Sequence, residues 1–119
     1  MRDHVVYDPE IETRPTAEQF ELDRVSYKKQ VQYLFDHSPF YREKLEEAGF
    51  DTPEKVGDLS EIGALPFTEK DEIRATQAAH GPFGAHLAAN PEDLRRVFST
   101  SGTTGTPCFT LCISFFKQN

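Results

Sequence analysis

Pairs of a helix-capping residue and a proline recur along this chain of 119 residues. Ser38-Pro39, Thr52-Pro53 and Asn90-Pro91 each place a capping side chain before a proline. Serine, threonine and asparagine cap helix N-termini, and proline suits the first helical position, where its missing N–H costs nothing. The same proline would break a helix that ran through it. These pairs therefore predict a series of short helices, each with its own start.

Helices are expected over 16–37, 39–48, 53–59 and 69–79, followed by a helical turn at 91–94. In the first, Thr16-Ala17-Glu18-Gln19 has the form of a capping box, and apolar residues follow at spacings of seven, four and three. Gly49 is a suitable C-terminal stop for the second helix. Residues 81–84, "GPFG", predict a turn. The apolar face expected for the first helix consists of Phe20, Tyr27, Val31 and Leu34, broadened by Leu22, Val25 and Phe35.

The chain changes character near its end, where strand-forming residues replace helical periodicity. Residues 96–100, "RVFST", are rich in β-branched and aromatic side chains and predict a strand. Residues 108–116, "CFTLCISFF", include seven apolar residues of nine and predict a second strand. Only 37% of the residues are hydrophobic and the mean hydropathy is −0.59, so we expect one helix-rich domain, or part of one, with a modest core.

Charge and targeting signals exclude several classes of partner. The net charge is −7 and no basic cluster is present, which disfavours nucleic acid and anionic membranes. There is no signal-peptide-like start and no apolar window long enough to cross a membrane. Cys108 and Cys112 do not form a disulfide framework, so a cytoplasmic location is expected. No metal-ligand spacing is recognised among the histidines, which we interpret as surface or capping residues: His4, His37, His80 and His86.

The segment between the two expected strands is "STSGTTGTP", residues 99–107. A phosphate needs several donors in a small volume, and glycine lets backbone N–H groups approach while serine and threonine add hydroxyls. The segment lacks the lysine of a Walker A loop and the glycine spacing of a dinucleotide-binding loop. From the residues alone, a flexible linker, a hairpin turn and a phosphate site all remain open.

Ser-Gly-Thr-Thr-Gly-x-Pro after a strand resembles the signature loop of the adenylate-forming enzymes, the acyl-CoA synthetase superfamily. Two upstream segments, "HSPFYREKLEEAGF" (37–50) and "LPFTEKDEIR" (65–74), are similar to the N-terminal region of the phenylacetate–CoA ligase branch. The resemblance covers about residues 24–110. It implies an α/β fold, of which this chain is the helix-rich N-terminal part of the large domain, ending in a strand, phosphate loop and strand. Residues 1–15 would be an extended lead-in, and 16–119 a partial domain truncated after the loop.

The resemblance also implies a reaction and a site. In the full-length family, an acid, ATP and CoA give acyl-CoA, AMP and pyrophosphate, so ATP with Mg²⁺, CoA and an aryl acid are the implied partners. No catalytic or metal-binding residue is assigned in this chain, because the other catalytic groups lie beyond residue 119. We expect the isolated chain to be inactive. The implied phosphate-binding residues are Thr100, Ser101, Gly102, Thr103, Thr104, Gly105 and Thr106.

Two alternatives follow from the short chain. It is either a small non-catalytic nucleotide-binding module or an interaction module whose strands complete another polypeptide. The apolar run 108–116 is expected to behave as an orphaned strand that promotes self-association. The apolar end of the chain is also typical of a truncation or a frameshift.

Overall fold

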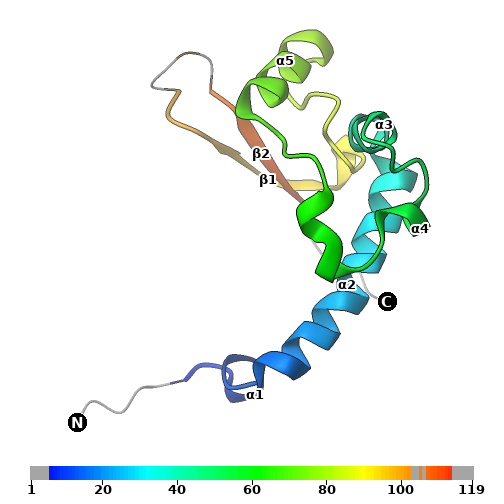
Figure 1. The fold of residues 1–119 in the computed structure, drawn as a ribbon. Helices are drawn as coiled ribbons and strands as arrows, with labels where there is room; N and C mark the ends of the chain where they lie inside the picture. The colour runs from blue at the N-terminus through cyan, green and yellow to red at the C-terminus, as the bar shows by residue number, and fades with distance from the viewer. Residues whose placement is uncertain (1–5, 103–104, 106, 114–119) are drawn as a thin grey trace.

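The computed structural model describes residues 6–102, 105 and 107–113. It is helix-rich and has two strands near the C-terminus, as the sequence predicts, and these strands pair as an antiparallel sheet (Figure 1). No helix of the described residues is long and apolar enough to span a membrane. The elements in chain order are α1 (Pro9–Glu12), α2 (Thr16–His37), α3 (Pro39–Glu47), α4 (Pro53–Val56), η1 (Leu59–Ala64), α5 (Lys70–His80), η2 (Pro91–Asp93), β1 (Leu94–Ser99) and β2 (Phe109–Ile113).

The core lies where the second half of α2 meets α3 and α4. Val31 and Phe35 are one helical turn apart on α2 and are both buried. They pack with Leu45 of α3 and Val56 of α4 in one cluster. Partly buried side chains surround this cluster: Tyr27, Phe50 and Leu65. Because only four residues form its buried centre, the core is as modest as the composition predicts.

Caps set the boundaries of the short helices. The Ser38 hydroxyl accepts a hydrogen bond from the Tyr41 N–H at the start of α3, and the Thr52 hydroxyl accepts one from the Lys55 N–H at the start of α4. Both predicted starts are confirmed. The expected helix over 53–59 is too long, since Gly57 adopts a φ of 82° and ends α4.

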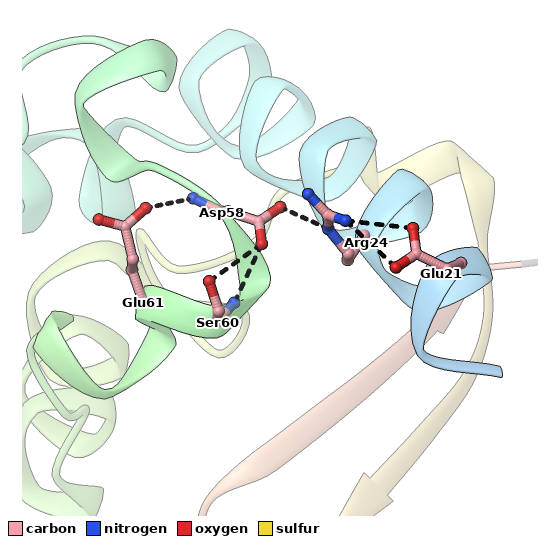
Figure 2. A network of polar contacts seen from close by, with 5 residues as sticks. All are labelled: Glu21, Arg24, Asp58, Ser60 and Glu61. Carbon is pink, nitrogen blue, oxygen red and sulfur yellow. Dashed lines mark hydrogen bonds and ion pairs between the residues drawn. The ribbon is translucent and has the colours of Figure 1, made fainter. Parts of the chain in front are cut away.

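Asp58 begins the 3-10 helix η1, which the sequence analysis missed. Its carboxylate accepts hydrogen bonds from the N–H and hydroxyl of Ser60, and the Glu61 carboxylate accepts one from the Asp58 N–H. The other oxygen of the Asp58 carboxylate pairs with Arg24 Nε of α2 at 2.9 Å. Figure 2 shows Arg24 lying between Asp58 and Glu21. This network joins η1 to α2 and lowers the pKa of Asp58 to about 2, chiefly through the hydrogen bond from Arg24.

Two expectations about the N-terminal segment are wrong. Residues 1–15 are not extended throughout, because Asp8 accepts a hydrogen bond from the Ile11 N–H and starts α1, with Pro9 in its first turn. Thr16 is not a cap, because it is already the first residue of α2 and Pro15 occupies the capping position without a side-chain bond. The Asp8-Pro9 pair is the same signal that marks the later helices.

The first half of α2 lies apart from the core. Figure 1 shows α1 and the first turns of α2 extending away from the other helices. Phe20, Leu22 and Val25 are consequently exposed, although the sequence pattern places them in the apolar stripe. The stripe is confirmed only over the second half of the helix, where α3 and α4 cover it.

Polar contacts join α5 and the segment before β1 to the helical core. Lys44 of α3 forms a salt bridge with Glu72 of α5 at 2.5 Å. The Tyr33 hydroxyl of α2 donates a hydrogen bond to the Ala88 carbonyl. The predicted turn at 81–84 forms with a hydrogen bond from the Gly84 N–H to the Gly81 carbonyl. These contacts place the sheet relative to α2.

A valine pair on α2 tests the position of the core. Val31 is 6% exposed and Val25 is 55% exposed on the same helix. We expect Val31→Ala to lower the free energy of unfolding by about 2 kcal/mol, because it leaves a cavity in the core. Val25→Ala should change it by less than about 0.5 kcal/mol. Urea titration followed by circular dichroism measures both, and equal effects would contradict the assignment of the core.

The Arg24–Asp58 pair predicts a dependence of stability on acid. The pKa of Asp58 falls from an ordinary 3.8 to about 2 in the folded chain, so its contribution to stability is present above about pH 4 and is lost as pH falls towards 2. Asp58→Asn should remove this part of the pH dependence. Combined with Arg24→Gln in a double-mutant cycle, it should show coupling at pH 7 that shrinks as pH falls from about 4 towards 2. A coupling that is unchanged by pH would rule out the ion pair.

Candidate functional site

The candidate phosphate loop connects the two strands of an antiparallel hairpin. Ser99 of β1 pairs with Phe109 of β2, and Val97 pairs with Leu111. The first strand begins two residues before its predicted start, at Leu94, and Thr100 lies beyond its end. Because β2 pairs with β1, the expectation of an orphaned strand is wrong over 109–113. Residues 114–116 of the expected second strand lie outside the described part of the chain.

Thr100 and Cys108 form the neck of this loop. The Thr100 N–H donates to the Cys108 carbonyl at 3.0 Å, and the Cys108 N–H donates to the Thr100 hydroxyl oxygen at 3.0 Å. The second bond comes from a side chain, so it extends the hairpin pairing one step beyond Ser99 and Phe109. The two ends of the loop are therefore held together at its base.

Gly102 and Gly105 shape the described part of the loop. Gly102 has a φ of 66° and Gly105 a φ of 140°, both in the region that favours glycine. The Gly105 N–H donates to the Gly102 carbonyl at 3.0 Å and closes a turn. A Cβ on Gly102 would lie 2.7 Å from the Gly105 carbonyl oxygen and 2.9 Å from Pro107 Cγ. Both conformation and space thus require glycine at position 102.

The seven predicted phosphate-binding residues are only partly described. Thr100 lies at the neck, Ser101 is exposed, and the two glycines form the turn. Thr103, Thr104 and Thr106 lie outside the described residues. The structure brings the described members together on one loop, and phosphate binding by the set remains a prediction.

Cys108 attaches the neck to the beginning of α5. Its side chain is 6% exposed, and its thiol donates to the Lys70 carbonyl at 3.9 Å, a length at the limit for a sulfur hydrogen bond. Cys108 is therefore a buried packing residue. The side chain of Cys112 lies outside the described part.

His86 makes a second attachment near β2. Its Nδ1 lies 2.8 Å from the Thr76 hydroxyl of α5, and its ring packs edge-on against Phe40. Burial lowers the pKa of His86, and a hydrogen bond with the backbone of Phe109 acts in the opposite direction. His86 is only partly exposed, because α3, α5 and β2 each contact its ring, so the expectation of a surface histidine holds only in part. The sequence held no local signal for this contact, which joins residues ten apart.

No group of three or more histidine, cysteine, aspartate or glutamate side chains among the described residues is arranged to hold a metal. A small hollow of about 200 Å³ lies in the helical part, between α2, α3 and Leu65. Its lining is largely apolar and includes core residues Val31 and Leu45. This hollow is therefore part of the helical core.

Comparison of sequences finds similar ligases. The chain is 39% identical over 103 residues to a phenylacetate-coenzyme A ligase of Thermus thermophilus, covering 87% of this chain and 22% of that protein. It is 32% identical over 100 residues to a phenylacetate-coenzyme A ligase of Escherichia coli, covering 84% of this chain and 21% of that protein. The chain thus spans about a fifth of the length of these relatives. No protein-family model matches it.

Comparison of structures agrees. A crystal structure of 2-hydroxyisobutyryl-CoA ligase in complex with 2-HIB-AMP and CoA is similar with a TM-score of 0.77 and 37% identity, covering 88% of this chain and 22% of that one. The same ligase in its postadenylation state with 2-HIB-AMP is similar with a TM-score of 0.74 and 32% identity, covering 91% of this chain and 23% of that one. Identities above 30% accompany the likeness of fold in both cases.

A pair of glycines tests the shape of the loop. Gly102→Ala should destabilise the hairpin by about 1–2 kcal/mol or more, because alanine disfavours the left-handed region and its Cβ meets the Gly105 carbonyl. Gly63→Ala is the matched control, since that position has open space and ordinary backbone. Denaturation midpoints measure both. A tolerated alanine at 102 would contradict the described turn.

Proposed function

Because the chain belongs over its matched residues to the phenylacetate–CoA ligase branch of the adenylate-forming enzymes, we propose that it carries the ATP-phosphate loop of an AMP-forming acid–CoA ligase. The complete ligase would convert an acid, ATP and CoA into acyl-CoA, AMP and pyrophosphate in the cytoplasm. Phenylacetate or another aryl acid is the proposed substrate class. The observation that carries the proposal is the glycine turn at Gly102 and Gly105, closed at its base by two hydrogen bonds.

The chemistry of the loop fits a phosphate group. Because Gly102 carries no side chain, a ligand at the turn can come close to its backbone N–H, while the Gly105 N–H closes the turn. Ser101 is exposed and offers a hydroxyl donor beside it. Hydroxyls of Thr103, Thr104 and Thr106 would complete the donor set. Such donors stabilise the charge that develops on pyrophosphate as it leaves the α-phosphate.

We expect Mg²⁺ to be bound together with ATP, because the ion is carried by the nucleotide. In nucleotide sites this ion is held mainly by phosphate oxygens and water, with one or two carboxylates. The loop therefore needs no metal cluster of its own to bind a magnesium nucleotide. Its residues would hold and orient the phosphates, and the adenine, acid and CoA sites would come from the rest of a longer ligase.

Calorimetric titration of the 119-residue chain tests the loop directly. We expect heat of binding with Mg·ATP and with inorganic tripolyphosphate at millimolar concentrations, and none with adenosine, because the proposed contacts are to phosphates alone. We also expect no carboxylate-dependent release of pyrophosphate when phenylacetate or 2-hydroxyisobutyrate is added. Detecting that release would overturn the proposal that the isolated chain is inactive.

A second candidate is an interaction module, which the exposed apolar side chains of β1 favour. Val97 and Phe98 are about half exposed, and β2 has a free edge among the described residues. If tripolyphosphate and Mg·ATP produce no heat while the chain elutes as a dimer on size-exclusion chromatography, this candidate replaces the nucleotide site. A monomer that binds both ligands excludes it.

A further inference from the structure

Thr100, at the neck of the loop, makes hydrogen bonds that its neighbour Ser101 does not make among the described contacts. Its N–H donates to the Cys108 carbonyl, and its hydroxyl oxygen accepts from the Cys108 N–H, each at 3.0 Å. The N–H of Thr100 and the oxygen of its hydroxyl are thus engaged with Cys108, which fixes the orientation of this side chain. Ser101, one residue later, is exposed and has no such engagement among the described contacts.

The partner in this pair is itself fixed. Cys108 is buried, and its thiol contacts the Lys70 carbonyl at the first residue of α5. Beyond the neck, Gly105 bonds Gly102, and Pro107 lies where a Cβ on Gly102 would collide. A path of contacts therefore runs from α5 through Cys108 and Thr100 to the glycine turn.

We propose that Thr100 is a positioning residue, which latches the base of the loop to α5 through Cys108 and so places the donors of Ser101 and the N–H of Gly102. This inference rests on the proposed function and refines it at one residue. The hydroxyl supplies one of the two bonds of the latch, because beyond Ser99 and Phe109 the Cys108 N–H donates to the Thr100 side chain.

Three variants separate positioning from direct binding. Thr100→Val keeps the shape of the side chain and removes the whole hydroxyl, Thr100→Ser keeps the hydroxyl, and Thr110→Val removes an exposed hydroxyl from the adjoining strand as a control. The readouts are amide hydrogen exchange at Cys108 and Gly105 by NMR, and affinity for tripolyphosphate by calorimetry. Circular dichroism verifies that each variant remains folded.

We expect Thr100→Val to speed exchange at the Cys108 and Gly105 amides and to weaken tripolyphosphate binding by about three- to tenfold, the loss of one ordinary hydrogen bond. Thr100→Ser should restore both, and Thr110→Val should match the parent chain. Weaker binding with unchanged Cys108 protection would make Thr100 a direct ligand and overturn the inference. Unchanged binding with lost protection, or no change in either, would overturn it equally.

Failure of the proposed function can be distinguished from failure of the inference about Thr100. If the parent chain does not bind tripolyphosphate, the phosphate site is wrong, and exchange alone then judges the latch. Loss of Gly105 protection in Thr100→Val, restored in Thr100→Ser, would support it, because Gly105 lies beyond the neck. Full protection of Gly105 in the valine variant would reject it.

Discussion

Burial of Val31 and Phe35 against Leu45 and Val56 is the contact on which the arrangement of the helices depends. It joins one turn of α2 to two short helices that are too short to be stable alone. At about 1.5–3 kcal/mol for each buried side chain of this kind, the four contribute roughly 6–12 kcal/mol, comparable with the net stability of a small domain. The helices are therefore placed by very few side chains, and each capping bond around them has a large share in the result.

The candidate loop depends on this core only indirectly. Lys44 and Glu72 connect α3 to α5, Tyr33 connects α2 to the segment before β1, and Cys108 connects α5 to the loop. These are single hydrogen bonds or ion pairs and fix a direction, whereas the core is held by burial of apolar surface, which has no direction. The division explains how an acidic chain with little hydrophobic content can still hold a loop in a defined place.

Local signals predicted the fold well where one residue and its neighbours decide the outcome. Ser38 and Thr52 begin helices, and Gly102 takes a conformation that favours glycine. Asp8 and Asp58 are also capping residues, but they were not interpreted as helix starts, so α1 and η1 were not predicted. Exposure of Leu22 could not be predicted, because periodicity defines a face of α2 and says nothing of what covers it.

The candidate site likewise has features that the sequence shows and features that depend on the fold. Its glycines and hydroxyls are visible in the sequence, and similarity to known ligases identified the family. The pairing of Thr100 with Cys108 is not visible, since it follows from the strand register that places Ser99 opposite Phe109. The contact of His86 with Thr76 is not visible either, because it depends on how the chain folds back after the turn at 81–84.

Asp58 has a consequence for how this chain folds. One carboxylate oxygen serves Ser60 at the start of η1, and the other serves Arg24 on α2. Local ordering of η1 and its docking on α2 thus use the same side chain, so neither gains its full hydrogen bonding without the other. One side chain thus couples two events, and its loss would weaken both together.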